Sequence, residues 1–249
     1  MENMDSTVIA TSLAAIAGDI GTDPISLKLA LTAYLVALAI FIPISSWMAD
    51  RFGARNVFRT AMAVFVLGSI ACAFANSLSA FVLAWFLQGM GGALMTPVAR
   101  LVLVRSTPRH DLVNAMAWLT IPGLIGPIVG PPFGGFLTTF FSWHWIFLIN
   151  VPIGIIGIAL VSRFLPDTKR VAPRAIDFKG FGLAAPAFAL FAFGTSVISL
   201  PALPPLIGVV ATIVGVIMAA LYARHALATD NPLFDLRLLR FPFFRSAVV

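Results

Sequence analysis

The stretch Trp47-Met48-Ala49-Asp50-Arg51-Phe52-Gly53-Ala54-Arg55-Asn56-Val57-Phe58-Arg59 places four charged residues and a glycine between two long apolar runs. The lipid interior offers no hydrogen-bond partner to a free backbone. A chain this apolar therefore crosses a bilayer as helices and reverses only where water or protein receives its polar groups. We expect a tight, charged hairpin between two transmembrane helices at this stretch.

Eight apolar segments lie before and after this hairpin in the sequence, and their lengths are close to the roughly 20 residues that a bilayer core requires. They lie at 1–17, 27–48, 57–75, 79–104, 112–140, 145–163, 180–200 and 204–223. Apart from Lys28, the basic residues follow the second, fourth, sixth and eighth segments: Arg51, Arg55, Arg59; Arg100, Arg105, Arg109; Arg163, Lys169, Arg170, Arg174, Lys179; Arg224, Arg237, Arg240, Arg245. Lysine and arginine gather in cytoplasmic loops, so these gaps are predicted to be cytoplasmic, as is the N-terminus.

Composition supports an all-α, polytopic membrane protein. Hydrophobic residues make up 60% and charged residues 10% of the chain, with a mean hydropathy of +1.00. The net charge of +6 is spread over separate loops, which argues against a nucleic-acid partner. The three histidines fall in separate loops and form no catalytic or metal-ligand pattern, so we expect neither an enzyme nor a cofactor or metal.

Two acidic residues, Glu2 and Asp5, open the first apolar run. Carboxylates at membrane depth are expensive and are functional candidates by default. The alternative is that Met1 is the true start and both acids lie in cytoplasmic water. The short first run and the residues 241–249, which resemble the start of another helix, lead us to expect a fragment of a longer protein.

Polar residues inside the fourth segment are further candidates. Gln88 is a neutral polar group at mid-depth that needs a partner, and Arg100 lies one to two turns inside the cytoplasmic end. The Arg100 side chain either snorkels to the interface or has a buried role.

The hairpin itself has residue types suited to a mechanical role. The Asp50 carboxylate can accept bonds from an arginine or sit at a helix N-terminus, and Gly53 permits a sharp turn. With Arg51 and Arg55 these residues form a candidate cytoplasmic gate. Ordinary enrichment of cytoplasmic loops in arginine would explain the arginines but neither Asp50 nor Gly53.

The fifth segment contains Ile121-Pro122-Gly123-Leu124-Ile125-Gly126-Pro127-Ile128-Val129-Gly130-Pro131-Pro132-Phe133-Gly134-Gly135. Glycines spaced by four residues share one helix face and form a groove for a second helix. Prolines remove ladder donors and bend a helix. We predict a hinge and sliding surface formed by Gly126, Pro127, Gly130, Pro131, Gly134 and Gly135.

The chain divides into four parts by this pattern. Residues 1–163 form an N-terminal six-helix transport bundle whose first helix is truncated, and 164–179 a basic cytoplasmic linker. Residues 180–223 form an additional pair of transmembrane helices, and 224–249 a cytoplasmic segment followed by the start of a ninth helix.

Four stretches resemble signatures of the major facilitator superfamily, in its fourteen-helix drug:proton antiporter branch. They are Ser46-Trp47-Met48-Ala49-Asp50-Arg51-Phe52-Gly53-Ala54-Arg55, Gly126 to Gly135, Asp5-Ser6-Thr7-Val8-Ile9 and Asn231-Pro232-Leu233-Phe234-Asp235-Leu236-Arg237. The first stretch departs from the family's loop signature at Ser46 and Ala54. The resemblance covers essentially the whole chain. It implies an N-terminal six-helix bundle plus two extra transmembrane helices, and a second bundle outside this chain.

The function implied by the resemblance is secondary transport by alternating access, in a plasma membrane or bacterial inner membrane. We expect proton-coupled efflux of small amphipathic compounds or drugs, with Glu2 and Asp5 as the protonatable pair. Trp85 stands where the family has an arginine linked to proton coupling. Proton coupling therefore requires that Arg100, or Glu2 and Asp5, take over the charged role. The alternatives are a narrow-substrate carrier without proton coupling and a non-transporting half-carrier that acts as an assembly or regulatory partner.

Overall fold

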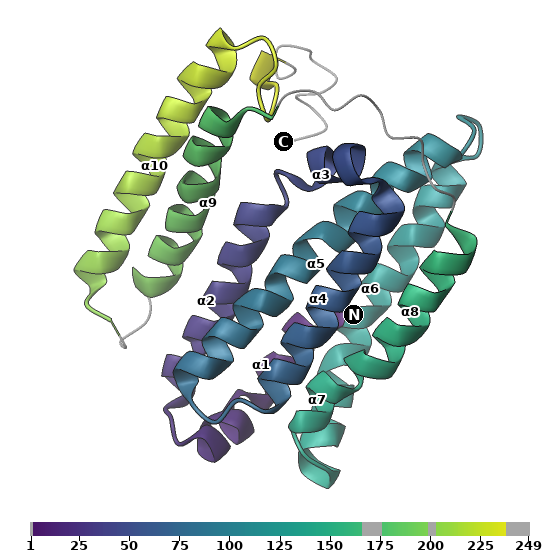
Figure 1. Ribbon diagram of the computed structural model, residues 1–249. Helices are drawn as coiled ribbons and strands as arrows, with labels where there is room; N and C mark the ends of the chain where they lie inside the picture. Colours follow the sequence, from purple (N-terminus) through teal and green to yellow (C-terminus); the bar gives the residue numbers. More distant parts are fainter. Residues whose placement is uncertain (1, 166–175, 199–202, 238–249) are drawn as a thin grey trace.

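The computed structural model describes residues 2–165, 176–198 and 203–237, and every regular element in these ranges is a helix (Figure 1). In chain order they are α1 (Glu2–Ile20), α2 (Pro24–Phe41), α3 (Ser45–Phe52), α4 (Ala54–Ala73), α5 (Leu78–Ser106), α6 (Leu112–Phe140), α7 (His144–Leu148), α8 (Asn150–Phe164), α9 (Phe178–Ile198) and α10 (Pro205–Ala228). The all-α prediction is confirmed.

Each of the eight predicted apolar segments overlaps helical structure: the second is divided between α2 and α3, and α7 and α8 together form the sixth. Seven helical spans in the described ranges are long and apolar enough to cross a membrane, and the apolar part of α1, Thr11–Ile20, is shorter. The side chain of Glu2, the linker residues 166–175 and the predicted ninth-helix start at 241–249 lie outside the described residues.

The hairpin differs from its prediction in one respect. The second span ends at Phe41, and α3 is a separate short helix that contains Trp47 and Met48, which were expected to close that span. Pro43 lies in the intervening turn, where the Ser45 hydroxyl donates to the Ile42 carbonyl oxygen at 2.7 Å. A proline has no N–H for the helix ladder, so α2 stops there.

The reversal predicted at Gly53 is confirmed. Gly53 has a φ of 86°, in the left-handed region that side chains with a Cβ avoid, and it separates α3 from α4. The charged stretch is therefore a short helix followed by a glycine turn.

Glycines allow the central helices to approach closely. A Cβ placed on Gly68 of α4 would lie 2.5 Å from the backbone nitrogen of Gln88 on α5. A Cβ on Gly91 of α5 would lie 2.5 Å from the carbonyl oxygen of Ala61. The backbones of α4 and α5 thus touch directly, as small residues permit in membrane bundles.

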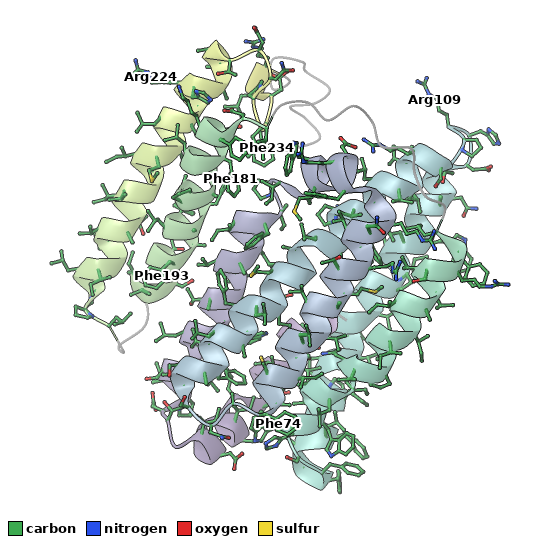
Figure 2. All side chains as sticks on the ribbon, viewed as in Figure 1. Phe74, Arg109, Phe181, Phe193, Arg224 and Phe234 are labelled. Atoms are coloured by element: carbon green, nitrogen blue, oxygen red, sulfur yellow. The ribbon has the colours of Figure 1, made fainter. Side chains whose placement is uncertain are left out.

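The pair α9 and α10 lies beside α2, which α9 contacts (Figure 1). Gly194 and Gly208 face each other across this pair, since a Cβ on Gly208 would lie 2.8 Å from the Gly194 carbonyl oxygen. Arg109 and Arg224 lie at one end of the molecule and Phe74 at the other (Figure 2). We call the end with these two arginines the basic end.

Candidate functional site

The carboxyl of Asp5 is buried inside the bundle. Its side chain on α1 belongs to a residue that is only 3% exposed. Asn150, the first residue of α8, donates through Nδ2 to both carboxyl oxygens, at 3.0 Å to Oδ1 and 2.8 Å to Oδ2. Gln88 of α5 donates through Nε2 to Oδ2. Two amides from two different helices therefore hold one carboxyl.

Two residues of α4 complete this network. The Ser69 hydroxyl accepts from Gln88 Nε2 at 3.3 Å and from Asn150 Nδ2 at 3.0 Å, and it donates to the Phe147 carbonyl oxygen at 3.0 Å. The thiol of Cys72 donates to Gln88 Oε1 at 3.7 Å. We call Asp5, Ser69, Cys72, Gln88 and Asn150 the carboxyl network.

The carboxyl network contains no basic side chain among the described residues. Its donors to Asp5 are neutral amides, which orient the carboxyl without cancelling a negative charge. An unpaired charge in a low-dielectric interior costs several kcal/mol. Neutralisation of Asp5 by a proton or by a cationic ligand is therefore the chemistry that this arrangement supports.

The depth of the network follows from helix geometry. Gln88 is ten residues from the first residue of α5, so it lies about 15 Å along the helix from that end, at 1.5 Å per residue. The network therefore lies well inside a helix that is long and apolar enough to span a bilayer.

Trp85 occupies the position of the expected arginine. It is fully buried, with its ring centroid 5.8 Å from that of Tyr34 and 5.7 Å from that of Phe81. Its indole Nε1 finds no hydrogen-bond acceptor among the described residues. A neutral aromatic side chain thus lies one helical turn from Gln88, at the position where the family has an arginine.

The predicted gate residues lie together at the basic end. Asp50 on α3 accepts a hydrogen bond from Arg105 Nη1, in the last turn of α5, at 2.6 Å. Arg55 donates through Nη2 to the Ser162 carbonyl oxygen of α8. The hairpin is therefore tied to the ends of two other helices.

Arg51 makes a different contact. Its guanidinium carbon lies 5.7 Å from the Trp47 ring centroid and 6.0 Å from that of Phe52. It stacks on rings of its own helix, and it pairs with no acid in the part of the chain that the structure describes.

Arg100 lies apart from the carboxyl network. It follows Gln88 by twelve residues on α5, which places it about 18 Å away along the helix axis. Arg100 is exposed and lines a cavity of about 600 Å³ with residues of α4 and α6. Arg100 therefore does not contact Asp5 or Gln88 in this structure, and its role in proton coupling stays a prediction.

The glycines and prolines of the predicted hinge lie in one continuous helix, α6. Gly134 packs on α1, since a Cβ there would lie 2.6 Å from Val8 Cγ1 and 2.8 Å from Thr11 Oγ1. Gly130 is also buried, whereas a Cβ on Gly135 would meet nothing within 4 Å. The close contact of α6 with α1 supports the predicted groove.

Sequence reasoning missed three members of the network as site residues, Asn150, Ser69 and Cys72. Asn150 carried a usable signal, because an amide in an apolar segment needs a partner as much as Gln88 does. Ser69 carried none, because a helical serine can satisfy its hydroxyl on its own backbone.

Comparison with known proteins agrees with this architecture. Residues 1–223 match the family described as the Major Facilitator Superfamily. The putative multidrug resistance protein MdtD of Escherichia coli O139:H28 (strain E24377A / ETEC) is 39% identical over 240 residues, which cover 96% of this chain and 51% of that protein. MdtD of Citrobacter koseri (strain ATCC BAA-895 / CDC 4225-83 / SGSC4696) is 38% identical over the same length.

The crystal structure of a D-xylose-proton symporter shares the fold, with a TM-score of 0.60 at 15% identity over 92% of this chain and 65% of that one. The chain spans about half the length of the curated relatives that it matches. The family match covers most of the sequence and the fold agrees with it. This chain belongs to the major facilitator superfamily.

Proposed function

We propose that the protein containing this chain is a secondary active transporter that exports small amphipathic compounds in exchange for protons. The observation that carries this proposal is the Asp5 carboxyl, which is buried between helices and whose donors among the described residues are neutral amides. The relatives named as multidrug resistance proteins support the direction and the type of substrate.

In this proposal Asp5 binds and releases the coupled proton. Asn150 and Gln88 fix the carboxyl through hydrogen bonds that a protonated or an ionised carboxyl can accept, and Ser69 orients these two amides by accepting from both. A proton, or a cationic substrate in its place, removes the cost of the buried charge. The proton and the cationic substrate neutralise Asp5 in turn. Their movements across the membrane are therefore coupled without direct contact between them.

Residues 1–163 act as one bundle of an alternating-access carrier, with the substrate site at its interface with a second bundle. Residues 164–179 are a cytoplasmic linker, 180–223 an additional membrane pair, and 224–249 a segment that leads to a ninth helix. We place the protein in a bacterial inner membrane, with the N-terminus in the cytoplasm.

Conformational change is assigned to two contacts. The Asp50–Arg105 ion pair, with Gly53 and Arg55, forms the cytoplasmic gate. The α6 face with Gly130 and Gly134 slides on α1, and the neighbouring Pro127 and Pro131 let α6 bend. Ligand binding then shifts a pre-existing equilibrium between the two orientations of the bundle.

The test is proton-driven efflux of ethidium, a fluorescent cation, in inverted membrane vesicles that contain the full-length protein. Asp5→Asn keeps the size and most hydrogen bonds of the side chain but cannot exchange a proton. We expect its efflux to fall to the level of vesicles without the protein.

Asp19→Asn is the matched control, because Asp19 is an exposed carboxyl on the same helix and its bond from Trp143 Nε1, at 3.0 Å, is one that an amide oxygen also accepts. Equal efflux in the parent and Asp5→Asn proteins would remove Asp5 from proton coupling. The absence of ethidium movement by an inserted parent protein would refute cationic-drug efflux.

A further inference from the structure

The cavity beside Arg100 lies near the basic end of the bundle. Arg100 is six residues from the last residue of α5, about 9 Å along the helix, and the cavity measures about 600 Å³. Its walls come from three helices and include Phe58 and Met62 of α4, Met95 of α5, and Leu119 and Pro127 of α6. It is separate from the carboxyl network.

Arg100 is the only charged residue among the described residues that line this cavity. No hydrogen bond or ion pair joins its guanidinium to another described residue. Three neighbouring arginines differ: Arg105 pairs with Asp50, Arg55 donates to the Ser162 carbonyl oxygen, and Arg51 stacks on Trp47. The Arg100 donors are therefore available to a ligand.

The cavity walls are suited to an apolar body of variable shape. Methionine side chains are flexible and polarizable, and they adapt to different partners. The volume falls within the range of about 300–1,000 Å³ that is typical of sites for drug-sized molecules. A guanidinium presents paired donors that match a carboxylate or phosphate. The Arg100 charge and the apolar walls of the cavity thus favour a ligand with an acid group and an apolar body.

We propose that this cavity binds an amphipathic anion, with the acid group on Arg100 and the apolar body between α4, α5 and α6. The ligand is either a free organic acid or an anionic phospholipid, and in both cases the recognised chemistry is the same. This inference does not depend on proton-coupled transport, because it concerns equilibrium binding at a site about 18 Å from Gln88 along α5.

The test measures binding of 1-pyrenebutyrate to the full-length protein in nanodiscs of phosphatidylcholine at pH 7.5, where the probe is an anion. We expect Arg100→Gln to raise the Kd about tenfold or more, as the loss of a charge-assisted hydrogen bond predicts. Arg100→Lys keeps the charge, so we expect it to retain much of the affinity, which shows that the fold tolerates substitution here.

Two controls isolate the site. Arg109→Gln removes the same charge from an exposed position at the same end (Figure 2), and it should change the Kd less than about twofold. The neutral analogue 1-pyrenebutanol should bind parent and Arg100→Gln proteins alike. Equal losses in Arg100→Gln and Arg109→Gln, or no loss in Arg100→Gln, would overturn the proposal. The second result would indicate that Arg100 snorkels or pairs with the other half of the protein.

Nanodiscs that contain phosphatidylglycerol distinguish the two sources of the anion. Competition that weakens 1-pyrenebutyrate binding to the parent but not to Arg100→Gln identifies a phospholipid, and unchanged binding identifies a free organic acid. Asp5→Asn should bind the probe as the parent does. If ethidium efflux is not observed, the binding of 1-pyrenebutyrate still tests the Arg100 site independently.

Discussion

Asn150 Nδ2 lies 2.8 Å from Asp5 Oδ2, which joins the first residue of α8 to the start of α1 across 145 positions of sequence. Asn150 also reaches Oδ1 and the Ser69 hydroxyl, so one amide holds two helices in register. Asn150 is itself only 2% exposed, so the side chain is shielded from bulk solvent.

We predict that Asn150→Ala destabilises the full-length protein by about 1–3 kcal/mol, since it leaves a buried carboxyl with fewer donors. Thermal unfolding in detergent measures this loss as a lower Tm. Asn76→Ala, in the exposed turn before α5, is the control and should change the Tm little. Equal Tm values for the two variants would show that the Asn150 amide does not stabilise the bundle.

The contact of α6 with α1 gives a second prediction. Gly134→Ala places a Cβ 2.6 Å from Val8 Cγ1 and 2.9 Å from the Val8 carbonyl oxygen, so the two helices must separate. Such overpacking costs about 1–3 kcal/mol. We expect a lower Tm and slower ethidium efflux.

Gly135→Ala is the matched control at the next position of α6, where a Cβ meets nothing within 4 Å. Alanine has the higher helix propensity, so this change should leave the Tm unchanged or raise it. If both substitutions have the same effect, helix propensity decides the result and the α6–α1 contact does not.

A third prediction concerns the end of the α9–α10 pair at which α9 begins and α10 ends. Partial burial raises the pKa of Asp177, but the Gly180 N–H at 2.8 Å and His225 Nε2 at 2.9 Å stabilise its carboxylate, and the net result is a pKa below the ordinary 3.8. A lowered pKa contributes stability that is present above 3.8 and is lost as the pH falls through the folded-state value.

We therefore expect Asp177→Ala to lower the Tm by the equivalent of about 1 kcal/mol at pH 6, the usual cost of losing a helix cap. The difference from the parent should shrink as the pH falls below 3.8. Asp230→Ala, an exposed carboxylate at the end of α10, should show no such difference. A Tm gap between parent and Asp177→Ala that grows toward low pH would contradict the assignment.

The order of helices could be predicted from sequence because it depends on local signals. Apolar length sets each span, and the arginines after every second span mark the turns. The end of the second span was misplaced because the segment up to Met48 is as apolar as a continuous helix. Only the break at Pro43 and the start of α3 at Ser45 separate the two elements.

The carboxyl network could be predicted only in part, because it is tertiary. Asp5 and Gln88 were recognisable as polar groups in apolar segments. That they meet depends on the crossing of α1 with α5, and the link through Ser69 depends on α4, none of which a single segment encodes. Arg100 shows the converse case, since its charge suggested a role beside Asp5 and Gln88, whereas twelve residues of α5 separate it from Gln88 in this structure.

The last prediction concerns the Asp50–Arg105 ion pair of the proposed gate. Both side chains are about one-third exposed or less, at 27% and 35%, so solvent screens the pair and its contribution to stability is small, about 0–1 kcal/mol. The ion pair should instead affect the rate of efflux, because breaking this pair frees α3 from the end of α5. We expect Asp50→Asn and Arg105→Gln to slow ethidium efflux severalfold while the Tm changes little.

The charge-reversed double variant Asp50→Arg/Arg105→Asp restores an attractive pair in the opposite sense. Asp50→Arg alone or Arg105→Asp alone places like charges together. If the gate requires attraction between these two positions, the double variant should transport ethidium faster than either single variant. Arg109→Gln is the control, because Arg109 is exposed at the same end (Figure 2) and should leave the efflux rate unchanged. Failure of the double variant to recover, with normal membrane insertion, would mean that Asp50 acts through its place in α3 and not through Arg105.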